Sequence, residues 1–427
     1  MEIICGRLYW ASSENEDQAA ASVELPFRGP CWMQMNEIAP HMHTFNVDEN
    51  QAFTYDAWGD TDFGPLNLAS VVRFSRQLEA KLVDPELESA YIVHWCGMTA
   101  ECQANAALLM CAFQVLVLLR TAEEAWQPFS RRTDLSWPAF CDSDACRYRG
   151  ELFEITVLQC LRTLDRAVHL GWFDYSKFSC EKFDRLAKTE VGDISEIIPG
   201  RLFVMSAPED TEFDEEGDPQ ATPHILAPTL IELGVTDVVQ LGSQSYDKAG
   251  FTDTGLTVHH LAVADVGPPR KADIDFFNRL VETEPGGVVV HCGAGLGRSC
   301  ALISFFVMKH FLFNAAELIA WFRLCRPGSL MGPWAKFIRD KELVPETSAC
   351  RRQVLLARAA VCRHLHFLLL LGQRALQELD PDQVRRILEY VLPLYCTTRG
   401  KQVLWTFPRE IFCGFYQCTD LVQSPLH

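Results

Sequence analysis

A cysteine and an arginine six positions apart, Cys292 and Arg298, are the residues of this chain with the clearest chemical potential. A thiolate is a strong nucleophile, but an ordinary cysteine thiol has a pKa near ~8.5 and is mostly protonated at neutral pH. Nearby N–H groups or positive charge must therefore stabilise the thiolate. A planar guanidinium binds two oxygens of a phosphoryl group at once. The pair predicts attack on phosphorus by Cys292, with Arg298 as the phosphate clamp.

The residues between this cysteine and arginine are mostly small and favour a tightly curled loop that opens a helix. N–H groups at the start of a helix stabilise anions, both a thiolate and a phosphate. Ser299, which follows the arginine, is predicted to donate a hydrogen bond to the sulfur as it departs in the second step. The predicted phosphate-binding residues are Gly293, Ala294, Gly295, Leu296 and Gly297.

This loop also resembles three other kinds of site besides that of a phosphatase. A Walker-type phosphate loop ends in Gly-Lys-Ser/Thr, whereas here Arg298 precedes Ser299. The glycines resemble a dinucleotide-binding pattern, but that pattern requires glycine at position 298. The third is an ordinary strand–turn–helix with a buried cysteine. The complete set of residues after a predicted strand favours a cysteine-dependent phosphatase.

Cleavage of a phosphate ester also needs a general acid for the leaving oxygen, and Asp265 is the predicted acid. It follows a predicted strand at 257–264, which ends at the same edge of the sheet as the strand before the catalytic cysteine. The segment 267–269, Gly-Pro-Pro, is consistent with a loop that closes over substrate. Two rivals, Asp273 and Asp275, lie where a helix begins and are interpreted as capping and first-turn residues.

Strands alternating with helices must position these residues. This alternation predicts an α/β fold with a mostly parallel sheet covered on both faces. Strands are predicted at 91–94, 201–205, 237–241, 257–264 and 288–290, and helices at 105–119, 153–170, 273–283 and 301–313.

Composition limits the remaining possibilities. The 427 residues suggest two to three domains, and 48% hydrophobic residues are enough for packed cores. Lysine and arginine number 38 against 56 acidic residues, so 38 − 56 gives a net charge of −18, which argues against nucleic-acid binding. Seven carboxylates lie within 209–218, and such a run is interpreted as a solvated loop rather than a binding site for basic substrates.

No targeting or metal-binding pattern is found. Residues 1–17 lack the basic and apolar regions of a secretory signal, and histidines and arginines interrupt the apolar stretch 354–371, so no membrane span is expected. The 17 cysteines follow no disulfide or zinc-ligand spacing. We therefore expect an intracellular protein, cytoplasmic or nuclear, that needs no metal and no cofactor.

Several motifs beyond the loop resemble the cell-division-cycle-fourteen family of dual-specificity phosphatases. The resemblance extends over about 40–345 and excludes the carboxyl-terminal tail. The similar segments are DFGPLNLA (62–69), QANAA (103–107), FTDTG (251–255), VMKH (307–310) and IAWFRLCRPGS (319–329).

The resemblance implies two tandem protein-tyrosine-phosphatase-like domains joined by a linker helix, of which only the second is catalytic. The implied limits are 1–170 for a non-catalytic domain, 171–192 for the linker and 193–345 for the catalytic domain. Residues 346–427 then form an accessory helical tail, for which packing on the parent domain is favoured over binding a protein partner. The strand at 91–94 echoes the one before Cys292, but Glu101 and Cys102 stand where an arginine is needed.

The resemblance further implies phosphoprotein substrates and a preference for phosphoserine followed by proline, with a basic residue nearby. The family reads that residue with an acidic groove, and Glu190 and Asp193 are the acids that match, although a third expected acid is Ala187. Family analogy also makes a centrosomal or ciliary location conceivable.

Departures from the family pattern raise a second hypothesis. Trp334 and Ala335 stand where the family has glutamines that position the hydrolytic water, so slow hydrolysis of the phosphocysteine is predicted. The alternative to a fast enzyme is thus a phosphoprotein-binding pseudo-phosphatase. Cys300, beside Ser299, could trap an oxidised Cys292 as a disulfide, but a plain apolar helix residue is the favoured interpretation. Gln240 replaces an expected arginine, which nothing in the sequence explains.

Overall fold

A computed structural model describes residues 1–23, 42–48, 50–55, 63–140, 155–242, 246–263 and 269–341 of the chain. The chain divides into two compact units, Met1–Leu356 and Ala357–His427, and every described residue belongs to the first. The predicted general acid Asp265 and the predicted helical tail at 346–427 lie outside the described residues.

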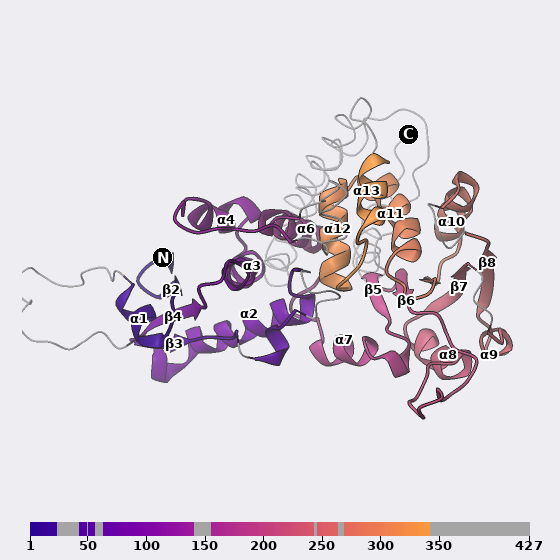
Figure 1. Cartoon of the computed structure of the whole chain (residues 1–427), viewed down its shortest axis with the longest axis horizontal. Helices are drawn as coiled ribbons and strands as arrows, with labels where there is room; N and C mark the ends of the chain where they lie inside the picture. Colours follow the sequence, from indigo (N-terminus) through magenta and orange to yellow (C-terminus); the bar gives the residue numbers. More distant parts are fainter. Residues whose placement is uncertain are drawn as a thin grey trace, which may run out of the picture. The chain divides into compact units, whose positions relative to one another are not determined.

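The first half contains a four-stranded sheet in the order β1-β2-β4-β3 (Figure 1). Strand β4 lies parallel to both β2 and β3, and β1 closes the edge in the antiparallel direction. The strands are β1 (Glu2–Ile4), β2 (Leu8–Ser12), β3 (Met42–Phe45) and β4 (Tyr91–Cys96). The helices of this half are α1 (Glu16–Ala21), α2 (Leu68–Val83), α3 (Ala100–Leu116), α4 (Ala122–Ser130) and α6 (Val157–His169), with short 3-10 turns at Gln51–Phe53 and Pro85–Leu87.

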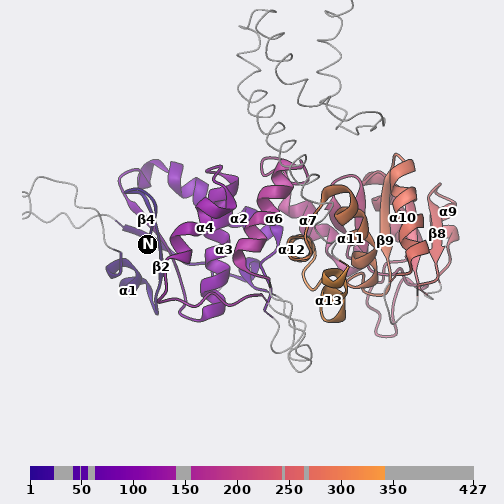
Figure 2. The same ribbon diagram turned by 90° about the horizontal axis from the view of Figure 1, so that it is seen from above.

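The second half contains a five-stranded sheet in the order β5-β6-β9-β7-β8 (Figures 1 and 2). Its central strand β9 is parallel to β6 and β7. The strands are β5 (Ser195–Ile198), β6 (Leu202–Met205), β7 (Val235–Leu241), β8 (Thr257–Leu261) and β9 (Gly287–His291). The helices are α8 (Pro223–Glu232), α9 (Ala249–Thr252), α10 (Lys271–Thr283), α11 (Arg298–Phe311), α12 (Ala315–Cys325) and α13 (Pro333–Asp340).

The two sheets repeat one topology. In each, an antiparallel edge strand precedes a parallel strand, and a central strand leads directly into a buried helix, β4 into α3 and β9 into α11. His94 of β4 and His291 of β9 occupy equivalent registers, each between the two neighbouring parallel strands. The predicted fold class, two tandem α/β units of the same kind, is confirmed. The linker contains α7 (Cys180–Leu186) and a 3-10 turn, Thr189–Val191.

Two of the predicted helices begin too late in the sequence. Helix α3 starts at Ala100 rather than near 105, because the Thr99 hydroxyl accepts a hydrogen bond from the Cys102 N–H at 3.2 Å and caps a polar first turn. Helix α11 likewise starts at Arg298 rather than near 301. In both cases the apolar run marks only the buried body of the helix, and the helix begins one turn earlier.

The two halves meet where α6 packs against α12. Arg166 of α6 donates a hydrogen bond to Glu317 Oε2 at 2.8 Å and to the Leu312 carbonyl at 3.1 Å. Its guanidinium also lies over the Phe313 ring, 4.3 Å from the centroid, and the Trp172 ring stacks on the same phenylalanine. Arg166 thus holds the turn between α11 and α12 from the first half of the chain.

His94 is a buried histidine in the first sheet. Its ring lies 4.8 Å from that of Phe74 and 5.0 Å from that of Phe45, and neither ring nitrogen has a hydrogen-bond partner among the described residues. Burial lowers the pKa of His94 to about 3. The folded chain therefore keeps this imidazole neutral, and the described residues around it supply no hydrogen-bond donor or acceptor to its ring nitrogens.

We expect His94→Phe to raise the free energy of unfolding by about 1 kcal/mol at pH 7, because an apolar ring replaces two unpaired buried nitrogens. The difference in free energy of unfolding between His94→Phe and wild type should be larger by about 1.4 kcal/mol at pH 5.5 than at pH 7. In the unfolded chain His94 becomes protonated below pH ~6.5, whereas in the folded chain it stays neutral down to about pH 3. The unfolded state therefore binds an extra proton between these values, and the wild type loses stability as the pH falls. Urea denaturation at the two pH values measures this difference. His224→Phe, at an exposed site, is the control, and an equal pH dependence in His94→Phe and wild type contradicts the prediction.

Candidate active site

The six-residue loop 292–297 lies between the end of β9 and the start of α11. Cys292 follows the last residue of β9 and is 4% exposed, and Arg298 is the first residue of α11. The strand is buried on all sides and the helix runs back against the sheet (Figure 2). The structure thus brings Cys292, Arg298, Ser299 and the five predicted phosphate-binding residues together in one turn.

The carbonyl groups of this loop are bonded on its outer side. Five consecutive carbonyls, from Gly293 to Gly297, each accept a hydrogen bond from a residue outside the loop. An anion needs donors, and a loop whose acceptors are all engaged outside presents its N–H groups to the centre. The donors, in order, are Ala207 N (2.7 Å), Arg326 Nη2 (2.8 Å), Cys300 Sγ (3.3 Å), Leu330 N (2.9 Å) and Ala301 N (2.8 Å).

Two of the loop glycines are required by close approaches. Gly295 has φ +68°, and a Cβ there would lie 2.3 Å from the Met205 carbonyl oxygen. A Cβ on Gly297 would lie 2.4 Å from Nε1 of Trp334, so the indole of α13 lies directly against the loop backbone. Both positions allow only glycine, which explains the spacing of small residues in the sequence.

The surroundings of Cys292 favour its ionised form. Burial raises the pKa of the thiol, but the hydroxyl and N–H of Ser299, the positive charge of Arg298 and the N–H of Gly295 outweigh burial, and the pKa is lowered from its ordinary value. The Ser299 hydroxyl is buried and has no oxygen or nitrogen partner among the described residues, which leaves it to the sulfur. The site therefore favours the thiolate form of Cys292, which is the nucleophilic form.

His291 precedes the nucleophile and is neutral. Its Nε2 lies 2.9 Å from the Tyr246 hydroxyl, and burial lowers its pKa to about 4. Its Nδ1 lies 3.5 Å from the Cys292 carbonyl oxygen. Because this imidazole carries no charge at neutral pH, the thiolate depends on Arg298 and the N–H groups for its stabilisation.

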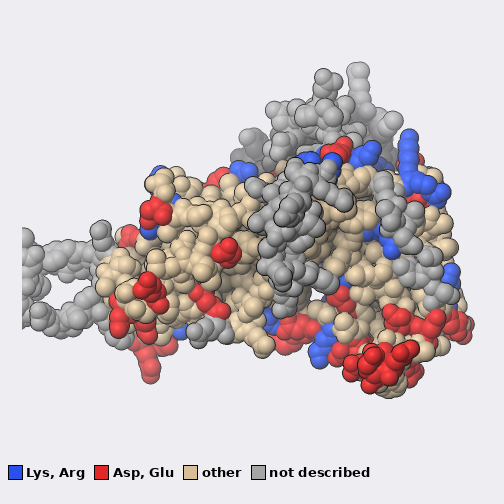
Figure 3. Space-filling model, viewed as in Figure 1, with Lys and Arg blue, Asp and Glu red and all other residues tan. Residues whose placement is uncertain are grey.

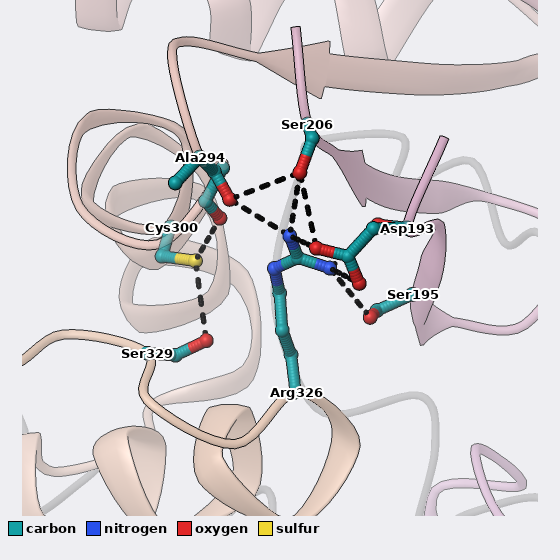
Figure 4. A network of polar contacts seen from close by, with 8 residues as sticks. Asp193, Ser195, Ser206, Ala294, Cys300, Arg326 and Ser329 are labelled. Carbon is teal, nitrogen blue, oxygen red and sulfur yellow. Dashed lines mark hydrogen bonds and ion pairs between the residues drawn. The ribbon is translucent and has the colours of Figure 1, made fainter. Parts of the chain in front are cut away.

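The two acids predicted to read a basic substrate residue each have a partner in the structure. Asp193 lies behind the loop, where Oδ1 accepts a hydrogen bond from Arg326 Nη1 at 2.9 Å (Figure 4). Glu190 is at the surface, 3.6 Å from Lys188 Nζ. Their substrate-binding role stays a prediction. No role was predicted for Arg326 from the sequence, although its position in 319–329, a segment similar to the phosphatase family, could have indicated one.

Two further predictions concern acidic residues away from the loop. Asp273 forms a capping box at the start of α10 and an ion pair with Arg270, so its interpretation as a capping residue is confirmed. The run 209–218 is largely exposed and closed by a bridge between Phe213 and Pro219, and Figure 3 shows acidic side chains gathered below α8. Six of the seven acidic residues there are exposed, and the seventh, Asp214, accepts hydrogen bonds from the backbone of the same loop.

The equivalent turn of the first half differs from the catalytic loop in length and in its polar groups. Only Gly97, Met98 and Thr99 separate β4 from α3, half the length of the loop after β9. The Gly97 N–H donates to Asp48 Oδ2 at 2.6 Å, so a carboxylate of the chain already occupies this amide. Burial and the charge of Asp48 raise the pKa of Cys96 far above its ordinary value. This turn lacks the thiolate, the arginine and the free amides of the second.

The chain is similar to known protein phosphatases in both of its halves. Residues 2–167 match the family described as "Dual specificity protein phosphatase, N-terminal half", and residues 221–311 match "Polymorphic toxin system, DSP-PTPase phosphatase". The chain is 32% identical to dual specificity protein phosphatase CDC14A of Mus musculus over 80% of its own length and 52% of that protein. It is 34% identical to CDC14A of Homo sapiens over 70% of the chain and 50% of that protein.

A fungal protein extends the similarity. Tyrosine-protein phosphatase CDC14 of Saccharomyces cerevisiae is 29% identical over 64% of the chain and 50% of that protein. The chain thus spans about half the length of the curated relatives it matches. Each half of the described structure overlaps one of the two matched family models.

Proposed function

Because this chain belongs to the CDC14 family of dual specificity protein phosphatases, we propose that it removes phosphate from phosphoserine, phosphothreonine and phosphotyrosine in proteins. The observation that carries the proposal is the loop after β9. There a thiol with a lowered pKa, a neighbouring arginine and inward N–H groups surround one centre. The family assignment alone concerns proteins about twice as long, so the activity rests on this geometry.

The proposed reaction has two steps. The Cys292 thiolate attacks phosphorus, the bond from phosphorus to the substrate oxygen breaks, and Asp265 gives that oxygen its proton. Arg298 and the loop N–H groups hold the phosphoryl oxygens as charge moves across them. Water then attacks the phosphocysteine and loses a proton to Asp265, and the sulfur leaves as a thiolate that accepts a hydrogen bond from Ser299. Inorganic phosphate departs, and both residues return to their starting states.

Release of inorganic phosphate tests the proposal. The purified chain is given an aryl phosphate and a phosphoserine-proline peptide, with Cys292→Ser as the blank. A phosphoserine-alanine peptide of the same length tests the proposed preference for proline after phosphoserine. Phosphate release no faster than that of Cys292→Ser on every substrate overturns the enzyme hypothesis.

Trp334 supports a slow second step. Its indole occupies the space beside Gly297, at the point where the loop joins α11, and an indole N–H donates but cannot accept a hydrogen bond. A water is positioned for attack by a group that accepts a hydrogen bond from it, such as the oxygen of a side-chain amide. We therefore propose that the phosphocysteine forms normally and hydrolyses slowly, which would keep the phosphoryl group on Cys292 after the dephosphorylated protein has left.

We expect a burst of product from an aryl phosphate, equal to one equivalent of enzyme, followed by slow turnover. Trp334→Gln should raise the slow phase on the order of tenfold, because a side-chain amide restores a group that can orient water. Trp334→Phe keeps an aromatic ring without the amide and should not raise it. Stopped-flow absorbance measures both phases. Steady release without a burst, at a rate that Trp334→Gln leaves unchanged, contradicts the prediction.

The second candidate function is a binding module that captures phosphoproteins without productive turnover. The same tryptophan favours it, and binding of a phosphoserine-proline peptide with neither a burst nor turnover would identify it. We place the protein inside the cell, where its phosphoprotein substrates occur. No helix among the described residues is long and apolar enough to cross a bilayer. That the tail at 346–427 binds a protein partner stays a prediction from the sequence, and packing on the parent domain stays the favoured one.

A further inference from the structure

Arg326, at the end of α12, is a buried arginine that contacts the outside of the phosphate-binding loop. Its side chain is 3% exposed, and Figure 4 shows its guanidinium between Asp193 and the carbonyl of Ala294. Nη2 donates to that carbonyl at 2.8 Å, and Nη1 donates to the Asp193 carbonyl at 2.6 Å and to the Ser195 hydroxyl at 3.1 Å. A charge buried this deeply needs hydrogen-bond partners, and both terminal nitrogens have them, while Nε has none among the described residues.

The acid opposite this arginine has its own structural constraints. Asp193 is a non-glycine residue with φ +48°, and both carboxylate oxygens contact the guanidinium. Ser206 donates to Asp193 Oδ2 at 3.0 Å, and its hydroxyl also lies 3.4 Å from the Ala294 carbonyl oxygen. The linker end, the end of β6 and the loop therefore converge on one guanidinium.

Six groups of the described residues donate to the five loop carbonyls, because the Ser206 hydroxyl shares the Ala294 oxygen with Arg326, and Arg326 is the one charged side chain among them. The donors to Gly293, Leu296 and Gly297 are backbone N–H groups, and the donor to Gly295 is a thiol. Hydrogen bonds from charged donors are roughly twice as strong as neutral ones. The Ala294 carbonyl is also in the middle of the curl, where a flipped peptide would turn an acceptor toward the phosphate.

We propose that Arg326 is a positioning residue for the reaction. It holds the Ala294 carbonyl away from the phosphate site, so that the loop N–H groups face Cys292 and the phosphoryl oxygens. Asp193 is then the counter-charge that fixes Arg326, rather than a residue that reads the substrate. The proposal deepens the proposed function and rests on it only in taking the loop as the phosphate site.

Two readouts that need no turnover test this role. Hydrogen–deuterium exchange of a peptide covering 292–299 reports loop order, and the pH dependence of Cys292 alkylation reports thiolate stabilisation. Arg326→Met should speed exchange in that peptide at least about tenfold and shift the alkylation profile toward that of an ordinary cysteine. Arg326→Lys keeps the charge but reaches fewer partners and should show an intermediate shift.

Arg166→Met is the matched control, because Arg166 bonds the opposite end of α12 and lies away from the loop. It should lower the melting temperature while leaving loop exchange and the alkylation profile unchanged. If Arg326→Met leaves a carboxylate unpaired and fails to fold, Arg326→Met with Asp193→Asn removes that charge, and Arg326→Lys gives the result on its own.

A folded Arg326 variant with wild-type loop exchange and a wild-type alkylation profile overturns the proposal. An equal change in Arg166→Met also overturns it, because loss of any buried arginine would then loosen the loop. Absence of phosphate release by the wild type would defeat the proposed function instead. The exchange and alkylation results would still decide what Arg326 does.

Discussion

Replacing Cys292 with serine should lower phosphate release from an aryl phosphate by roughly 10⁴- to 10⁶-fold, because the reaction loses its nucleophile. A serine hydroxyl in the same place stays protonated at neutral pH, and His291 is too weak a base to activate it, since burial lowers the pKa of His291 to about 4 and Tyr246 contacts its Nε2. The loop N–H groups and Arg298 remain, so the variant should still bind tungstate or phosphate. Continuous phosphate detection gives the rate, and calorimetry gives the anion affinity.

The matched control for this substitution is Cys96→Ser in the first half of the chain. Cys96 is fully buried and its pKa is raised, so its thiol is not a nucleophile and the variant should keep wild-type turnover. Loss of turnover in a folded Cys96→Ser variant would contradict the assignment of chemistry to the second half. Cys292 should also react with iodoacetamide at a pH where a free cysteine peptide is still unreactive, because its pKa is lowered.

Gly295→Ala should lower turnover by about 10²-fold or more while the chain still folds. The new methyl group would lie 2.3 Å from the Met205 carbonyl oxygen, and alanine at φ +68° carries a strain of about 1–2 kcal/mol. Both effects push the loop away from β6 and turn its N–H groups from the phosphate. The variant should therefore lose anion affinity and rate together.

Calorimetric titration with tungstate and thermal unfolding separate this effect from general destabilisation. Gly200→Ala is the control, because Gly200 also has a positive φ, +65°, but a Cβ there meets no atom within 4 Å. It should lose a similar amount of stability and keep its affinity for tungstate. Equal anion affinity in Gly295→Ala and wild type would contradict the geometric argument.

Much of the catalytic loop was predictable because its chemistry demands adjacent residues. The strand, the cysteine, the glycines and the arginine follow one another, so one segment contains the thiolate, the curl and the clamp. Asp193 was harder to interpret, because its partner Arg326 lies 133 positions away and only folding joins them. A lone acid near a predicted groove suggests substrate binding until its counter-charge is seen.

Trp334 shows another limit of sequence reasoning. Its departure from the family pattern could be found, but its contact with Gly297 depends on how α13 packs beside α11, which no local pattern specifies. Asp48 is similar, since nothing near it in the chain indicates that it accepts a hydrogen bond from Gly97. Topology was predictable from alternation of strands and helices, whereas side-chain partners across the fold were not.

The contact of Arg166 and Trp172 with Phe313 has a consequence for how the chain can be divided. The aromatic seam makes the two halves one cooperative folding unit, although the chemistry lies in the second alone. A fragment starting at Ile194 would expose Phe313 and Phe311 to water and leave Glu317 without its arginine. Without the first half, the catalytic half would lose the contacts that cover these aromatic rings, so we expect the fragment to fold poorly even though it contains every catalytic residue.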